Sequence, residues 1–225
     1  MIEINKIYNN DCMNILPNID DNSIQLTITD IPYDEASRAS NGLRLLEREK
    51  ADVLTFNLND WMEQVYRVTK GTVIVFCGIG QVSPIYNFFR DKDNGTVRQL
   101  LWVKTNPSPM NGDSVYLSGV ENAVWYRKPN STFNAHCKNT VFEYASGTSK
   151  LHPTEKNHKL IAELIRDNSN EGDLILDPCC GSGSHCLVAK ENNRNFIGIE
   201  LYKDYYEIAT KRLKQPIQKK LLGFG

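Results

Sequence analysis

The chain has 225 residues, of which 40% are hydrophobic and 24% charged, and its formal net charge is −1. This composition is typical of a soluble globular protein with one core, and no apolar run approaches the roughly 20 residues of a membrane span. A near-neutral charge argues against a protein coated in phosphate contacts, so nucleic-acid binding would depend on a local basic face. The polar start MIEINKIYNND does not resemble a signal peptide, so we expect a cytoplasmic protein without a membrane partner.

The residue pattern in the first 33 positions predicts two strands, each followed by polar residues. Glu3–Tyr8 alternates apolar and polar residues, and a short helix then opens at residues 10–12 and stops at Pro17. The β-branched run Ser23–Thr29 predicts a second strand, which delivers the tetrapeptide DIPY at its carboxyl end. Ligands of open α/β sheets bind at that edge, so these side chains are candidates for a site.

Residues 34–54 form a polar segment that becomes weakly helical and carries Arg38 and Arg44. Because it follows the DIPY tetrapeptide directly, the segment could close over a ligand or track phosphates. Acidic residues interleave with the basic ones, which is also typical of a solvated surface helix.

The middle of the chain alternates helical and strand patterns. An amphipathic helix is expected over Asn59–Thr69, and the apolar run TVIVFC predicts a central strand over Thr72–Cys77. The other elements expected here are a helix over Gln81–Phe89, a strand over Val97–Val103, a loop from Lys104 to Tyr116, a strand over Val120–Tyr126 and a loop from Arg127 to Lys150.

The stretch from Asp173 to Glu200 reads as one βαβ unit, preceded by a helix over Lys156–Asn168 and followed by one over Tyr202–Leu213. Gly181 and Gly183 allow positive φ in its turn, and the helix from about Ser184 offers free N–H groups. Glu200 lies twenty-three positions after Asp177, where an acidic side chain can hold ribose hydroxyls. The unit therefore predicts a nucleoside ligand.

A nicotinamide dinucleotide is the other nucleoside to weigh. Its fingerprint needs three glycines as G-x-G-x-x-G, and Cys186 occupies the third position here, which disfavours a dehydrogenase. Cys179, Cys180, His185 and Cys186 cluster nearby, but the adjacent cysteines lack the C-x-x-C spacing of a metal site. We expect no metal there, and reduced thiols that pack in the core.

At this point the residues resemble a family. DPCCGSGS resembles the DPFxGSGT motif of S-adenosylmethionine (SAM) dependent DNA amino-methyltransferases, with Cys179 in place of Phe. DIPY resembles their catalytic DPPY, with Ile31 for the first proline, and LHPTEK resembles their HPTxKP segment, with Asn157 for the final proline. With FIGIE, these motifs fall at matching relative positions from Tyr8 to Leu213.

The resemblance implies a Rossmann-like SAM-methyltransferase fold, an α/β fold in which an open, mostly parallel twisted sheet carries helices on both faces. The catalytic strand precedes the cofactor strand, so the motif order is circularly permuted. A single domain over 1–225 is expected, with a catalytic half at about 1–130, a short recognition loop at about 127–150 and a cofactor half at about 151–213.

The same resemblance implies SAM as the cofactor. Asp11 is the candidate contact to its adenine, although an N-cap role for the following helix is an equal alternative. The segment with His152, Thr154 and Lys156 is assigned to the methionine end of SAM. The remaining candidates are Asp177, Pro178, Cys179, Gly181, Ser182, Gly183, Ser184 and Glu200.

The catalytic candidates are Asp30, Ile31, Pro32 and Tyr33. An exocyclic amine is a poor nucleophile because its lone pair is delocalised into the ring. If Asp30 accepts one N–H and the main-chain carbonyl of residue 31 the other, the lone pair turns towards the methyl group. Tyr33 offers a face on which a flipped base can stack.

Candidates for contacts to DNA follow from the same resemblance. Lys104 and Asn106 are expected beside the base, and Arg127 and Lys128 open the short recognition loop. We expect a DNA adenine-N6 methyltransferase of the restriction-modification type that acts on a flipped base of double-stranded DNA. The alternatives are cytosine N4 and a non-catalytic SAM- or DNA-binding subunit. The loop is too short for an independent recognition domain, so either the target site is short, or a second copy of the chain in a homodimer or a specificity partner supplies the specificity. All of this requires the Asp30 corner and the Gly181 corner to open into one cleft.

Overall fold

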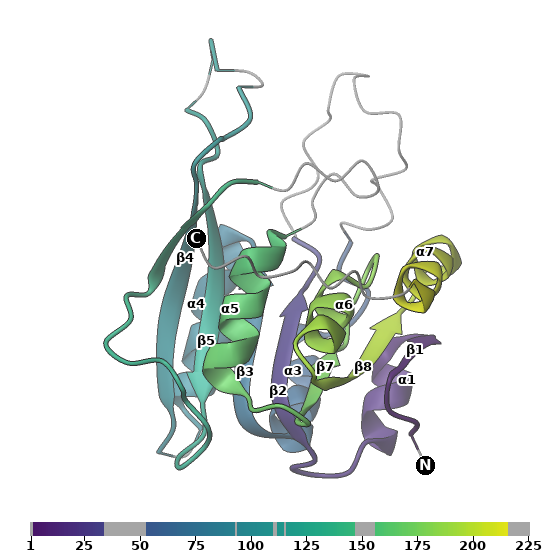
Figure 1. Ribbon diagram of the computed structural model, residues 1–225. Coiled ribbons are helices and arrows are strands. Elements are labelled where there is room, and N and C mark those ends of the chain that lie inside the picture. Colours follow the sequence, from purple (N-terminus) through teal and green to yellow (C-terminus); the bar gives the residue numbers. More distant parts are fainter. Residues whose placement is uncertain are drawn as a thin grey trace, which may run out of the picture.

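Eight strands form one sheet in the computed structural model, which describes residues 2–33, 53–92, 94–109, 112–114, 116–146 and 156–215. Their order across the sheet is β1-β8-β7-β2-β3-β5-β4-β6 (Figure 1). The strands are β1 (Lys6–Asn9), β2 (Ile24–Asp30), β3 (Thr69–Cys77), β4 (Thr96–Lys104), β5 (Val120–Arg127), β6 (Val141–Tyr144), β7 (Leu174–Asp177) and β8 (Asn195–Glu200).

The sheet is mostly parallel, as the sequence predicts. β1, β8, β7, β2 and β3 pair in parallel, and β6 pairs in parallel with β4. β5 runs antiparallel to both of its neighbours, β3 and β4. Among the described strands, β5 alone therefore begins at the edge where the others end.

Helices cover both faces of this sheet, which explains why its central strands are buried on both sides. α5 (His158–Asn168), α6 (Ser184–Glu191) and α7 (Lys203–Lys214) pack on one face, in front of the sheet in Figure 1. α1 (Cys12–Ile15), the short 3-10 helix η1 (Leu16–Asn18), α3 (Leu58–Val68) and α4 (Ile79–Arg90) pack on the other. Six of the seven residues of β2 are buried as a result.

Asparagine side chains begin the two amphipathic helices α3 and α5. Asn57 accepts hydrogen bonds from the N–H groups of residues 59 and 60, and Asn157 does the same for Lys159 and Leu160. Asn157 Nδ2 also donates to the carbonyl of Ala145 at 2.8 Å. The residue that replaces the final proline of HPTxKP is therefore the N-cap of α5.

The predicted loop from Arg127 to Lys150 is wrong in one respect, because it contains β6. This strand pairs with β4 from Leu101↔Val141 to Lys104↔Tyr144 and buries Phe142. Only Phe142 of its four residues is buried, so the segment lacks the apolar run that marks the central strands. Among the described residues, no helix is long and apolar enough to cross a membrane.

Candidate active site

The carboxyl ends of β2 and β7 lie next to each other and bring the two predicted corners together. The strands pair at Leu26↔Ile175 and Thr27↔Leu176. Asp30 ends β2 and Asp177 ends β7, so the DIPY tetrapeptide and the glycine turn leave the sheet side by side. This confirms the neighbourhood that the motif order requires.

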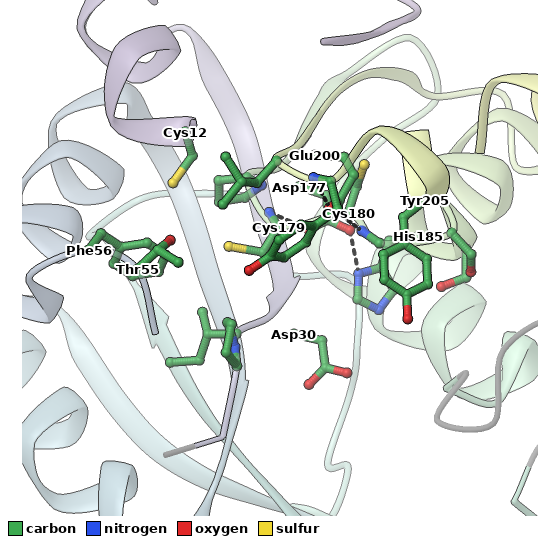
Figure 2. A pocket seen from close by; sticks show the side chains of 18 of the residues that line it. Cys12, Asp30, Thr55, Phe56, Asp177, Cys179, Cys180, His185, Glu200 and Tyr205 are labelled. Carbon is green, nitrogen blue, oxygen red and sulfur yellow. Dashed lines mark hydrogen bonds and ion pairs between the residues drawn. The ribbon is translucent and has the colours of Figure 1, made fainter. Parts of the chain in front are cut away.

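One pocket spans both corners, with an empty volume of about 1190 Å³ including its open mouth. Figure 2 shows Asp30 on one side of it, Glu200 and Asp177 on another, and Thr55 and Phe56 on a third. The predicted site residues that line it are Asp11, Asp30, Ile31, Pro32, Tyr33, Lys156, Asp177, Pro178, Cys179, Gly181, Ser182, Ser184 and Glu200.

The turn between β7 and α6 depends on its two glycines. Gly181 has φ 51° and Gly183 φ 75°, and L side chains rarely adopt this left-handed region. A Cβ on Gly183 would also lie 2.9 Å from the Cβ of Ala209 in α7. Gly183 thus lets α6 and α7 pack closely, while Gly181 lines the pocket.

Asp177 holds the turn through three contacts. Its Oδ1 accepts from the Thr29 hydroxyl at 2.7 Å and from the Cys179 N–H at 3.2 Å, and its Oδ2 lies 2.8 Å from Nδ1 of His185. His185 is 3% exposed, and among the described residues its Nε2 has no hydrogen-bond partner. A buried ring nitrogen at the pocket wall without a partner fits a polar group of a bound ligand.

Glu200 at the end of β8 supports the same turn from the other side. Its two oxygens accept from the N–H groups of Gly181 and Tyr202, both at 2.8 Å. Burial raises the pKa of this carboxyl to about 7, although those two N–H groups favour its charged form. Glu200 therefore lines the pocket as a hydrogen-bond acceptor whose charge changes with pH near neutrality.

Asp11 and Cys179 have structural contacts as well as places in the pocket wall. Asp11 Oδ1 accepts from the Met13 N–H at 2.8 Å, so the N-cap role is present in the structure. A hydrogen bond with Cys12, together with burial, raises the pKa of Cys179 well above its usual range. Cys179 is therefore a neutral thiol in the wall where the resembling family has phenylalanine.

The catalytic corner accommodates Ile31 in place of proline. The Ile31 N–H donates to the carbonyl of Phe76 at 3.2 Å, which a proline could not do. The Ile31 side chain is 1% exposed and packs in the core under α3 and α4. Gln81 donates to the carbonyl of Pro32 and accepts from the N–H of Gly78, both at 2.9 Å, and so holds the corner in place.

The ammonium of Lys156 sits at the centre of this corner. Its Nζ lies 2.7 Å from Asp30 Oδ2, 2.6 Å from Glu121 Oε2 and 3.0 Å from the Tyr33 hydroxyl. Lys104 binds the other oxygen of Glu121 at 2.7 Å. Burial raises the pKa of Asp30, and Lys156 opposes that rise. Burial disfavours the Lys156 cation, but Asp30, Tyr33 and Glu121 raise its pKa well above the usual range.

Four of the predicted DNA contacts lie within the described residues, and none of the four lines the pocket, although Lys104 contacts Glu121, which does. Lys104 is tied to Glu121, and Asn106 accepts from the N–H of Ser146 at 2.5 Å. Arg127 binds the carbonyl of Ser131 and Lys128 that of Tyr66, at the edge of the sheet opposite the pocket. The antiparallel direction of β5 puts them there. Arg38, Arg44, His152 and Thr154 lie outside the described residues.

Several pocket residues were not anticipated from the sequence. Glu121 is a charged residue at the start of a predicted strand, which is a signal for a site residue, whereas the sequence around His185 suggests only a metal ligand. Among the described residues, no group of His, Cys, Asp and Glu side chains could hold a metal ion. The other additions to the wall are Asn10, Cys12, Val53, Thr55, Phe56, Cys180, Leu201, Tyr202 and Tyr205.

Comparison with known proteins decides the family. A family model described as DNA methylase, for N6 and N4 methyltransferases, matches residues 24–211. The chain belongs to this DNA methylase family. Type II methyltransferase M.HpaI of Haemophilus parainfluenzae is 33% identical to this DNA methylase over 88% of the chain and 70% of the relative. M.HinfI of Haemophilus influenzae, also a type II methyltransferase, is 28% identical over 94% of the chain and 69% of the relative.

Solved structures agree with this assignment. The M1.HpyAVI–SAM complex superposes with a TM-score of 0.70 at 28% identity and covers 92% of this DNA methylase and 98% of the solved chain. The cytosine-N4-specific PvuII DNA methyltransferase gives a TM-score of 0.71 over 94% of the chain and 87% of its own. Its 20% identity shows the fold alone. The predicted family, fold and cofactor class, a SAM-dependent DNA amino-methyltransferase, are confirmed.

Proposed function

We propose that this DNA methylase transfers the methyl group of SAM to the exocyclic amine of a base flipped out of double-stranded DNA, and that the amine is N6 of adenine. One observation carries the proposal. Asp30 Oδ2 is bound to Lys156, whereas Oδ1 is buried at the pocket and has no partner among the described residues. An amine N–H would satisfy this unpaired carboxylate oxygen.

The cofactor fits the half of the pocket made by β7, β8 and the glycine turn. Glu200 would accept hydrogen bonds from ribose hydroxyls, and Asp11 lies in the wall where the adenine is expected. His185 Nε2 and the N–H groups at the start of α6 would receive the polar methionine end. When bound, SAM supplies an electrophilic methyl group on a sulfonium.

The chain's own groups then prepare the nucleophile. Asp30 and the carbonyl of Ile31 each accept one N–H of the amine, so that its lone pair turns out of conjugation with the ring. The amine nitrogen forms the bond to the methyl carbon as the carbon–sulfur bond breaks, and the bonding pair stays on sulfur. The nitrogen then gives up its surplus proton, for which Asp30 is the neighbouring acceptor, and solvent receives it.

The choice of adenine depends on the side chain at the first catalytic position. The resemblance associates Asp with the adenine enzymes of the family and Ser with many cytosine-N4 enzymes, and this chain has Asp30. A carboxylate is also a stronger acceptor for an amine proton than a hydroxyl. Cytosine N4 is the alternative that the experiment below distinguishes.

A non-catalytic subunit is the second candidate, motivated by Ile31, Cys179 and Asn157. Two of these three departures have structural compensation: Ile31 keeps the backbone carbonyl and adds a hydrogen bond, and Asn157 caps α5. They therefore favour a working enzyme over a degenerate one. A specificity partner or a second copy would supply DNA contacts in addition to those of the short segment 127–150, and the relatives of the restriction-modification type make a partner of this kind part of the proposal.

Mass spectrometry of nucleosides from DNA incubated with the protein and SAM tests the proposal. We expect N6-methyladenine from the wild type and none from Asp30→Ala, which should still bind SAM. N4-methylcytosine as the sole product would replace adenine by cytosine. An inert wild type that binds SAM and DNA would favour the non-catalytic subunit.

A further inference from the structure

We propose that Lys156 and Glu121 are positioning residues for methyl transfer, and that they fix Asp30 and Tyr33 in the orientation that receives the target base. The resemblance assigns the segment of Lys156 to the methionine end of SAM, so this is a different role for it. The inference rests on the proposed function and names two residues that act through Asp30.

The donors of Lys156 are fully used at the catalytic corner. An ammonium has three N–H donors, and here three acceptors lie within 3.0 Å: Asp30 Oδ2, Glu121 Oε2 and the Tyr33 hydroxyl. The side chain is 4% exposed. No donor remains for a carboxylate of the cofactor, so Lys156 serves the catalytic corner.

Glu121 in turn is held at both of its oxygens. Oε1 lies 2.7 Å from the Lys104 ammonium and Oε2 lies 2.6 Å from that of Lys156. Its backbone is fixed in β5, where it pairs with Trp102 of β4. Glu121 therefore connects strand β5 to Lys156, and Lys156 connects Glu121 to Asp30.

The backbone of Lys156 is held by the start of helix α5. Lys156 immediately precedes Asn157, which caps α5 and binds the carbonyl of Ala145. With the backbone held from α5 and the ammonium held from β5, Asp30 Oδ2 has one fixed partner. The second oxygen, Oδ1, is then left in one place as an acceptor for the amine.

The charges of this network balance. Asp30 and Glu121 are two carboxylates, and Lys104 and Lys156 are two ammonium groups. The titratable groups that influence or respond to Asp30 are Lys156, Glu121, His185, Tyr33 and Cys77. Lys156 lowers the pKa of Asp30 and Glu121 raises it. Removal of the Lys156 ammonium should therefore raise the pKa of Asp30, and removal of the Glu121 charge should lower it.

Three variants of the network and one control test the proposal. Lys156→Met removes the ammonium, Lys156→Arg keeps a cation, and Glu121→Gln keeps the shape but not the charge. Lys138→Met is the matched control, because Lys138 also binds two carboxylates, Glu163 at 2.9 Å and Asp167 at 2.6 Å, and does not line the pocket. Each protein is measured for SAM affinity, for the single-turnover rate of DNA methylation, and for the Asp30 titration by carbon NMR without ligand.

We expect Lys156→Met to slow methyl transfer by about 10- to 100-fold and to leave SAM affinity within about threefold, because a misplaced acceptor loses orientation and not cofactor contacts. The pKa of Asp30 should rise in Lys156→Met and fall in Glu121→Gln. Methyl transfer should slow in both variants. Lys156→Arg should recover part of the rate, and Lys138→Met should keep it.

Folded Lys156→Met or Glu121→Gln protein that transfers at the wild-type rate, or whose Asp30 titration is unchanged, would overturn the proposal. A large loss of SAM affinity in Lys156→Met would return Lys156 to the cofactor. If Lys156→Met does not fold, Glu121→Gln carries the test alone. The NMR titration needs no DNA, so it judges the network even if the wild type proves inactive and the proposed function fails.

Discussion

The hydroxyl of Thr29 donates to Oδ1 of Asp177 at 2.7 Å, across 148 positions of sequence. Thr29 precedes Asp30 at the end of β2, and Asp177 ends β7. Both side chains are buried, and the bond links the catalytic strand directly to the cofactor strand. The distance between the two halves of the pocket is therefore set by a buried hydrogen bond as well as by the sheet.

Asp30→Asn should slow methyl transfer by about 100- to 1000-fold, the usual effect of losing one oriented polar group at a transition state. Asn keeps the shape of the side chain but offers a weaker acceptor to the amine. SAM affinity should change little. Single-turnover rates and calorimetric titration of SAM measure the two effects, and an unchanged rate would remove Asp30 from the proposed chemistry.

Gly183→Ala should destabilise the protein more than Gly172→Ala does. Both glycines have positive φ, so each alanine costs about 1–2 kcal/mol of backbone strain. A Cβ on Gly172 meets nothing within 4 Å, whereas one on Gly183 lies 2.9 Å from Ala209, which adds about 1–3 kcal/mol of overpacking. Urea unfolding gives both values, and equal losses would contradict the close packing of α6 on α7.

SAM affinity should depend on pH through Glu200. Its pKa in the folded protein is raised from 4.5 to about 7, and the charged form is the better acceptor for ribose hydroxyls. If only that form binds, the Kd for SAM should rise by about tenfold for each pH unit below 7. Glu200→Gln should flatten this dependence in calorimetric titrations from pH 5.5 to 8.5.

The raised pKa of Glu200 also makes the free energy of unfolding depend on pH. The folded protein holds the Glu200 proton more tightly than the unfolded chain, so the protonated group favours the folded state at acid pH. That contribution is lost as the pH rises from 4.5 to about 7. Glu200→Gln should remove this component of the pH dependence of the unfolding free energy, and an unaltered slope would contradict the raised pKa.

Ile31→Pro, which restores the proline of the family motif, should destabilise this protein by about 1–3 kcal/mol. It removes the N–H that donates to Phe76 and empties part of a buried position. The carbonyl of residue 31 remains, so methyl transfer should stay within a few-fold of the wild type. Ile28→Val is the control for lost volume alone, with a cost of about 0.5–1.5 kcal/mol. A proline variant as stable as the wild type would contradict the role of the N–H.

The sequence predicted the elements that depend on local chemistry. The buried strands β2, β3, β7 and β8 are rich in apolar and β-branched residues, and the glycine turn requires residues that accept positive φ. Motif order then predicted that DIPY and the turn would meet. The strands and the turn depend on residues that are neighbours in the sequence, and the structure confirms them together with the meeting of the two motifs.

Strand direction and long-range ion pairs could not be predicted in the same way. β5 looks like any other strand in the sequence, yet its reversal places Glu121 at the pocket and Arg127 at the far edge. Lys156 lies in a recognisable motif, but its three partners come from residues 30, 33 and 121. Such contacts exist only once the sheet has formed.

The reversal of β5 also has a consequence for engineering. The connection from β4 to β5 leaves and re-enters the sheet at the pair Val103↔Val120, and the N–H of Lys104 donates to the carbonyl of Gly119 at 2.8 Å. Both ends are thus clamped beside Glu121. We therefore expect that a change in the length of this connection leaves Glu121 and the catalytic corner in place, so that the connection can be varied independently of the residues that hold Asp30.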